Sequence, residues 1–166
     1  IVSGTTNQIT ASSGDILVQG FGSGHISLEE SAIAGGGNIT LNASTAGAIV
    51  NVAANISATG PAGNSLVVLA AGNVSFSCGA DVITANATHV VLNADRDANG
   101  AGSIYLGNGT VIASSGGDIT LGGGLNPLTT AATSTSSATE TAGVLLSGAS
   151  LASGTGNISI RGNGSA

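Results

Sequence analysis

The sequence predicts an all-β fold, a right-handed parallel β-helix in which about six coils of roughly 23–39 residues stack into a triangular β-solenoid. Repetition is the first reason, because one phrase returns along the 166 residues in forms such as QITASSGDILV, AIAGGGNITL and SSGGDITLGGG. Composition is the second, since the chain has 28 glycines and only 2% aromatic and 6% charged residues. Third, Ile, Val and Thr recur at regular intervals, which indicates short strands joined by tight turns rather than disorder.

Three kinds of strand recur in a fixed order, and each is identified by the apolar residue that opens its alternation. The first kind has the form Gly-Asn/Asp-Ile-Thr-Leu and is opened by Ile16, Ile39, Val67, Val90, Ile119 and Ile158. The second kind is opened by Val2, Ile26, Ile49, Val74, Ile104 and Val144. The third kind, an aliphatic residue followed by small residues, is opened by Ile9, Ile33, Ile56, Ile83, Ile112 and Leu151.

The spacing between these strands shows which corner of the coil varies. From a second to a third strand, and from a third to the next first strand, the steps stay between 6 and 11 residues, which suits a short strand plus a tight turn. From a first to the next second strand they run from 7 to 25 residues. This corner therefore carries two insertions, residues 93–102 (NADRDANGAG) and the Ser/Thr-rich residues 122–143. Insertions on one edge of a solenoid are often where binding occurs, so they are the predicted binding segments.

Stacking of the coils follows from how little each strand can bury. A strand offers two or three inward apolar positions. Burying one aliphatic side chain contributes about 1.5–3 kcal/mol, whereas fixing the backbone of one residue costs about 1–2 kcal/mol. An isolated coil is therefore unstable, and the coils must stack and share a core. The crossover preference makes the winding right-handed, and residues 1–166 are expected to form a single β-solenoid segment.

The charge balance excludes several classes of partner. The net charge is −6, and Arg96 and Arg161 are the only Lys or Arg residues. Nucleic-acid binding and polybasic contacts with lipid both need clustered cations, so neither is expected. No apolar run approaches 18 residues, so no membrane insertion is expected. The single Cys78 excludes an internal disulfide, and Ile1 is expected to begin a mature or excised piece.

The best candidate for chemistry is the run DRDANG at residues 95–100. It matches the opening of a calcium loop, in which alternating side-chain oxygens converge on a hard cation. The predicted calcium ligands are Asn93, Asp95, Asp97 and Asn99. The twelfth position of such a loop is Leu106, so the usual bidentate Glu is missing. The alternative is a polar loop closed by Asx turns.

Catalytic and cofactor-binding residues are not predicted, and the chain is not expected to be an enzyme. His25 and His89 precede different strands, and no Cys/His cluster surrounds them to form a metal site or a nucleophile–base pair. Glu29 and Glu30 lie beside the variable corner. A polysaccharide-degrading β-helix enzyme would need two carboxylates across a groove and aromatic side chains to hold the sugar. The only aromatic residues are Phe21, Phe76 and Tyr105.

Gly followed by Asn or Asp precedes many of the strands. The Asx residues of these pairs are Asp15, Asn38, Asn73, Asp118 and Asn157. Taken together, the pairs are interpreted as turn residues. Gly is expected to supply a positive φ, and the Asx side chain is expected to hydrogen-bond the backbone nearby.

Residues 89–124, HVVLNADRDANGAGSIYLGNGTVIASSGGDITLGGG, resemble the repeat region of filamentous-hemagglutinin-like exoproteins of bacterial two-partner secretion. The shared features are valine-leucine-asparagine, an Asp/Gly-rich loop, Gly-x-Ile-x-Leu and Gly-Gly-Asn/Asp-Ile, and the likeness is closest over residues 64–124. The resemblance implies a right-handed parallel β-helix, export across an outer membrane and display as a long fibre, extracellular or on the bacterial cell surface. No residues match the family's N-terminal secretion domain or an adhesive motif, so the chain is expected to be a piece of the shaft.

The expected function is that of a structural shaft segment of a secreted or surface-displayed bacterial adhesin or filament. Such a rod would present loops to a host or cell-surface ligand. Its other expected partners are further copies stacked end to end or neighbouring coils of a longer chain. The alternative is a carbohydrate- or ice-binding solenoid. An ice binder needs a regular outward array of Thr, whereas the predicted outward positions are mixed: Thr40, Thr120, Ser27, Ser75, Val68 and Tyr105.

Overall fold

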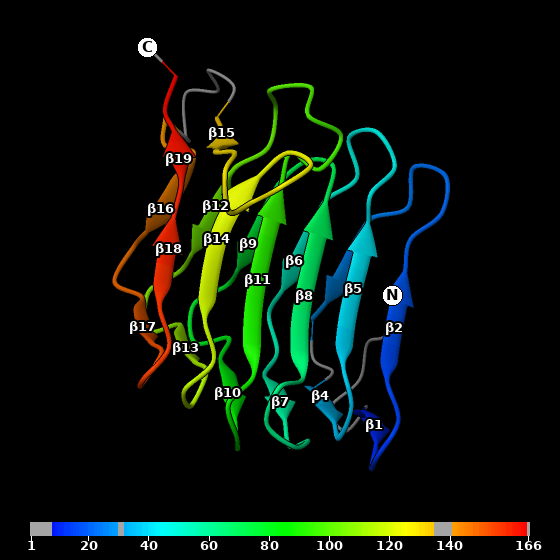
Figure 1. Ribbon diagram of the computed structural model, residues 1–166. Coiled ribbons are helices and arrows are strands. Elements are labelled where there is room, and N and C mark those ends of the chain that lie inside the picture. Colours follow the sequence, from blue (N-terminus) through cyan, green and yellow to red (C-terminus); the bar gives the residue numbers. More distant parts are fainter. Residues whose placement is uncertain (1–7, 30–31, 135–140, 166) are drawn as a thin grey trace.

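The structure, a computed structural model, describes residues 8–29, 32–134 and 141–165, and within these ranges it contains strands, turns and loops but no helix. In Figure 1 the chain runs up the front, crosses the top, descends behind and returns along the bottom before the next coil begins. The winding from the blue to the red end is right-handed. The predicted right-handed parallel β-helix is therefore confirmed.

Three sheets form the sides of the solenoid, and each strand pairs in parallel with its equivalent in the next coil. The first sheet contains β2 (Ile16–Gln19), β5 (Ile39–Ala43), β8 (Ser65–Ala70), β11 (His89–Ala94), β14 (Ile119–Gly123) and β18 (Ile158–Ile160). The second sheet contains β3 (Ile26–Leu28), β6 (Val50–Val52), β9 (Val74–Phe76), β12 (Ile104–Leu106) and β16 (Val144–Leu146). The third sheet contains β1 (Gln8–Ala11), β4 (Ala32–Gly35), β7 (Ile56–Ala58), β10 (Val82–Thr84), β13 (Val111–Ala113) and β17 (Ser150–Ala152).

Within the described ranges these strands make five complete coils. The strands β1 and β2 belong to a further coil, whose expected second-sheet strand, opened by Val2, lies outside the described residues. Two short strands, β15 (Ala132–Thr133) and β19 (Gly162–Asn163), form a small additional sheet. In the part of the chain that the structure describes, no helix is long and apolar enough to cross a membrane.

The core is a set of columns in which equivalent aliphatic residues of successive coils stack on one another. One column of the first sheet consists of four side chains that are each 0% exposed: Ile39, Leu66, Val90 and Ile119. In the second sheet the fully buried Phe76 lies in register between Val52 and Leu106. Because the strands are parallel and in register, the same apolar position must recur in every coil, and this produces the repeated phrase in the sequence.

Three of the predicted strand-opening residues are wrong by one position. Parallel pairing puts the inward residue at Leu66 rather than Val67, at Val50 rather than Ile49, and at Val82 rather than Ile83. Burial agrees, since Val82 is 0% and Ile83 45% exposed. At each of these places two aliphatic residues are adjacent, so alternation within the strand does not decide which of them points inward. Pairing in register with the neighbouring coils determines which of the two residues points inward.

The outer face of the first sheet also differs from the prediction. Val68, predicted to point outward, is 0% exposed and lies in the core. The register places an outer row at Leu17, Thr40, Val67, Val91, Thr120 and Ser159. This row mixes apolar and hydroxyl side chains, and Leu17 is 63% exposed whereas Thr120 is 5% exposed.

Candidate functional site

The two insertions contact each other at the corner between the first and second sheets, at the top of Figure 1. The Asn93 side-chain amide donates to the carbonyl oxygen of Gly124 at 3.1 Å, and the Gly124 amide donates to the Asp95 carbonyl at 3.1 Å. Gly102 and Thr133 exchange two backbone hydrogen bonds, at 2.8 and 2.9 Å. The insertions therefore form one layered unit rather than two separate loops.

The second insertion is also joined to the last coil. Of residues 122–143, the structure describes 122–134 and 141–143. Within it, β15 pairs in parallel with β19, and the Ala132 amide donates to the Arg161 carbonyl at 3.0 Å. Ala132 is 0% exposed and belongs to the core cluster. This segment, which shows no apolar periodicity in sequence, thus contains a short strand that anchors it.

The tip of the second insertion presents two leucines on an ordered turn. Leu125 is 73% and Leu128 is 56% exposed. The Asn126 side chain accepts the Leu128 amide at 3.1 Å, and the Asn126 carbonyl accepts the Thr130 amide at 2.8 Å. Arg161 donates from Nε to the Leu128 carbonyl at 2.5 Å. The turn is therefore held in place while both apolar side chains remain accessible. The Ser/Thr-rich composition of this segment did not predict the turn or its two exposed leucines.

Hydrogen bonds within the protein engage all four predicted calcium ligands. Asp95 is 3% exposed, and its carboxylate accepts the Gly100 amide at 3.0 and 3.2 Å. Asn99 donates from Nδ2 to the exposed Asp97 carboxylate at 2.9 Å. Asn93 is turned toward the second insertion, and its Oδ1 is buried without a hydrogen-bond partner in the described residues. Calcium binding stays a prediction, and these contacts are those of a polar loop closed on itself.

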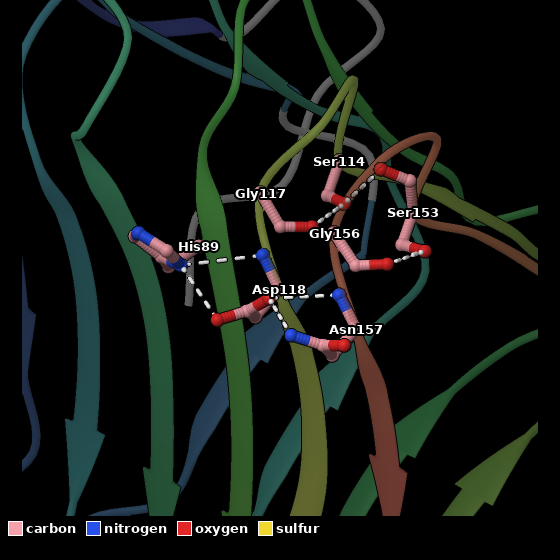
Figure 2. A network of polar contacts seen from close by, with 7 residues as sticks. All are labelled: His89, Ser114, Gly117, Asp118, Ser153, Gly156 and Asn157. Carbon is pink, nitrogen blue, oxygen red and sulfur yellow. Dashed lines mark hydrogen bonds and ion pairs between the residues drawn. The ribbon is translucent and has the colours of Figure 1, made fainter.

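A second polar feature runs along the solenoid, at the residue directly before the first inward residue of each strand (Figure 2). The carboxylate of Asp118 accepts the backbone amide of Asn157 at 2.7 Å and its side-chain amide at 3.2 Å. The Asp118 amide in turn donates to Nδ1 of His89 at 3.2 Å. The same contact joins Asn38 to Asp15, with the Asn38 amide donating to the Asp15 carboxylate at 2.7 Å.

The second and third sheets repeat this arrangement, which we call the polar ladder. It consists of acceptor side chains that bind the equivalent backbone amide of the next coil: Asp15, Asn38, His89 and Asp118 in the first sheet, His25 and Asn73 in the second, and Asn55 and Asp81 in the third. The bonds span between 23 and 39 residues. The prediction that the Asx side chains bond backbone within their own turn is therefore wrong for Asp15, Asn38, Asn73 and Asp118, because each accepts a backbone amide of the next coil.

The glycines of the Gly-Asx pairs also serve a different purpose from the predicted one. One glycine precedes each of the five predicted Asx residues, and none of these glycines has a positive φ: Gly14, Gly37, Gly72, Gly117 and Gly156. A Cβ on Gly117 would lie 2.1 Å from the Thr88 carbonyl oxygen, and one on Gly156 would lie 2.1 Å from the Gly117 oxygen. Here glycine permits close approach of successive coils. Ser153 spans the same corner, donating from Oγ to the Gly156 carbonyl at 2.7 Å (Figure 2).

The bonds from Asn157 change the acidity of Asp118. They hold the pKa of the Asp118 carboxyl below its ordinary value, chiefly through the backbone amide of Asn157, with smaller contributions from the Asn157 side chain and from His89. His89 Nδ1 lies 3.7 Å from Asp118 Oδ2, an ion pair only when the imidazole is protonated.

Ser65, His89 and Asp118 occupy one row of the first sheet in three successive coils, in the order of a nucleophile, base and acid. Their contacts are not those of a catalytic triad. The Ser65 hydroxyl donates to Asn38 Oδ1 at 3.1 Å, and His89 Nδ1 accepts a backbone amide. The row therefore joins coils in this structure.

The other sequence candidates lie apart from one another. His25 accepts the Ile49 amide at 3.0 Å in the second-sheet part of the ladder. Glu29 accepts from the Ser27 hydroxyl at 3.3 Å on the surface, and Glu30 lies outside the described residues. Over the part of the chain that the structure describes, there is no pocket, and no group of three or more His, Cys, Asp or Glu side chains is placed to hold a metal ion.

The C-terminal end of the solenoid exposes its core. We define the C-terminal face as the uncovered side of the last coil, made by β16, β17 and β18. Three of its inward-row side chains, Leu146, Ile158 and Ile160, are 39%, 44% and 45% exposed. Their register partners one coil earlier, which are Leu106, Ile119 and Leu121, are each 0% exposed.

Comparison with protein-family models, with curated proteins and with solved structures gives no match to this chain. The parallel β-solenoid therefore stands on the structure itself. The likeness to filamentous-hemagglutinin-like repeats rests on the sequence motifs alone.

Proposed function

We propose that this chain is a structural shaft segment of a secreted or surface-displayed bacterial adhesin or filament, a stiff rod that presents loops. The observation that carries the proposal is the continuity of the contacts from coil to coil. Within the described residues, every step between complete coils combines parallel strand pairing on all three sides with buried aliphatic columns. The polar ladder adds side-chain bonds at the corners of many steps.

Such an arrangement resists bending because tilting one coil on the next would stretch a hydrogen-bonded edge and open a close-packed core. The lack of a pocket in the described part of the chain suits a shaft, whose role does not require an enclosed site. The motifs at residues 89–124, which resemble the repeats of two-partner-secretion exoproteins, support export and an extracellular or cell-surface location.

Presentation of loops is supported by the corner that carries both insertions. The exposed Leu125 and Leu128 stand on a turn that Asn126 and Arg161 hold in place. A host or cell-surface ligand would bind here, because an ordered apolar projection loses little conformational entropy on contact. The insertions are the parts of the rod that vary most in length, so they are also where specificity would arise.

Rod stiffness is testable with two spin labels, placed at Leu17→Cys and Ser159→Cys in a Cys78→Ser background and measured at high dilution. Both positions lie in the outer row of the first sheet, five coil steps apart. The steps of a parallel sheet predict one narrow distance near 24 Å, at about 4.8 Å per step. Thr40→Cys with Ser159→Cys, one step closer, should be shorter by about 5 Å. A broad distribution for both pairs would contradict a stiff shaft.

Display is tested separately with antibodies against residues 122–134. They should label intact producing cells or the secreted fraction without permeabilisation. Labelling that requires permeabilised cells would contradict the proposed location.

A further inference from the structure

Residues 123–130 of the second insertion form a closed loop, which we call the display loop. It is drawn in yellow beside the ends of β14 and β11 in Figure 1. The Gly123 amide donates to the Thr130 carbonyl at 3.0 Å, so the two ends of the loop meet. Compact surface loops whose ends are joined in this way are frequently functional.

Side chains from the coils on either side hold the display loop against the outer face of the first sheet. Asn93, Gly122 and Arg161 occupy the same outward position in three successive coils. Asn93 donates to the Gly124 carbonyl at 3.1 Å, and Arg161 donates from Nε to the Leu128 carbonyl at 2.5 Å. Gly122 leaves room between them, since a Cβ there would lie 2.1 Å from a carbonyl oxygen of the loop. The display loop is therefore fixed to the side of the rod rather than to its end.

Three side chains on or beside the display loop are available to a partner. Leu125 and Leu128 are both more than half exposed. Arg161 is also exposed, and within the described residues its only side-chain bond is the one from Nε. A guanidinium has five N–H donors, so the terminal Nη groups remain free for an external acceptor. The loop thus presents an oriented cation next to two apolar side chains.

The charge and composition of this surface specify the chemistry of its partner. An oriented guanidinium binds a carboxylate through two parallel hydrogen bonds. The two leucines favour apolar groups beside that carboxylate, and the display loop has no aromatic residue on which a sugar ring could stack. Because the chain has a net charge of −6, a run of acidic residues or an anionic lipid surface would be repelled. A single carboxylate flanked by apolar side chains fits best.

We propose that the display loop and Arg161 together bind a segment of another protein in which one Asp or Glu is flanked by apolar side chains. This inference rests on the proposed presentation of loops by the rod and names the chemistry of the partner. The carboxylate accepts hydrogen bonds from the Nη groups of Arg161, and the apolar side chains pack on Leu125 and Leu128. One loop offers a small contact, so binding by one copy is weak and is strengthened when several copies are presented together.

A phage-displayed random peptide library, selected on the immobilised wild-type chain, tests this chemistry. Enriched peptides should share an Asp or Glu flanked by aliphatic or aromatic residues. For the best of them, made synthetically and measured by calorimetry, Leu125→Ser and Leu128→Ser should each raise the Kd about tenfold. Leu17→Ser is the matched control, because Leu17 is 63% exposed in the outer row of the same sheet. Equal weakening by the control, or enriched peptides without a carboxylate, would overturn the inference.

Arg161→Gln separates recognition of the carboxylate from support of the loop. Glutamine keeps an amide donor for the Leu128 carbonyl but removes the positive charge. Binding of the peptide to the wild type should weaken as salt rises, whereas the variant should bind about tenfold more weakly at low salt and show little salt dependence. The same salt dependence in both proteins would show that Arg161 only supports the loop, and would overturn the proposed recognition.

A selection that yields no peptide dependent on Leu125 and Leu128 would also overturn the inference. So would binding to phosphatidylserine vesicles that the same substitutions abolish, because the partner would then be a lipid surface. Neither result alters the spin-label distances or the antibody labelling, which test the rod and its display. Broad spin-label distances, or labelling that requires permeabilised cells, would instead overturn the proposed function even where peptides bind.

Discussion

The carboxylate of Asp118 accepts the backbone amide of Asn157 at 2.7 Å, although 39 residues separate the two in the chain. The longest coil lies between them, yet they occupy the same position in successive coils. The contact shows that insertions at the variable corner do not disturb the stacking, because a loop that leaves and returns at one corner keeps the strand register.

Removing the charge at Asp118 should change how stability depends on pH. The pKa of this carboxyl is lower in the folded chain than its ordinary value of 3.8, mainly because of the Asn157 amide. The ionised group therefore stabilises the fold above the unfolded pKa, and this stabilisation is lost as the pH falls through the lower folded pKa. Asp118→Asn keeps an acceptor oxygen but does not titrate.

Urea unfolding of wild type and Asp118→Asn between pH 7 and pH 2 measures this effect. The stability difference between the two proteins should be constant near neutrality and should shift in favour of the variant in acid. A difference independent of pH throughout would show that the Asn157 bonds do not favour the ionised carboxylate.

Gly117 and Gly14 form a matched test of close packing, since each precedes an aspartate at the start of a first-sheet strand. A Cβ on Gly117 would meet the Thr88 carbonyl oxygen at 2.1 Å, whereas a Cβ on Gly14 would meet nothing within 4 Å. Gly117→Ala should lower the free energy of unfolding by about 1–3 kcal/mol. Gly14→Ala should leave it unchanged or raise it by up to about 1 kcal/mol. Equal effects in denaturant titrations would contradict a packing role for Gly117.

Ile119→Asp should disrupt the solenoid at β14, the strand next to the last in the first sheet. Ile119 is 0% exposed and contacts the coils on both sides through the column from Val90 to Ile158. An unpaired carboxylate at this position should cost more than about 3 kcal/mol. Val91→Asp, in the outer row of the adjacent coil, is the control. If Ile119→Asp melts at the wild-type temperature, this side chain does not point into the core.

Calcium binding by residues 93–99 is tested by melting with and without the ion. The sequence predicts that millimolar calcium raises the Tm of the wild type, and that Asp97→Ala/Asn99→Ala removes the rise. Magnesium at the same concentration controls for ionic strength. A Tm that calcium leaves unchanged would show that the Asp95–Gly100 hydrogen bonds close this loop without a metal.

The fold could be predicted from the sequence because every coil of a solenoid repeats the same pattern of inward apolar residues. Apolar positions that recur at nearly constant spacing predict in-register stacking, and the third-sheet openers Ile9, Ile33 and Ile56 were located correctly for this reason. Register failed at Ile49, Val67 and Ile83, where an adjacent aliphatic residue was equally plausible. The two insertions were visible as irregular spacing, but their mutual contacts at Gly102 and Thr133 were not.

By itself, the sequence determined that short strands must stack in three recurring positions and that one corner tolerates insertions, because a coil with so few apolar residues cannot be stable alone. Only the tertiary structure decided what the polar residues of the corners do. Asp118 and Gly117 look like local turn residues, yet one bonds Asn157 and the other makes room for the backbone near Thr88. Their partners lie one coil away, and the number of residues between the partners changes with every insertion. No fixed spacing in the sequence therefore predicts these contacts.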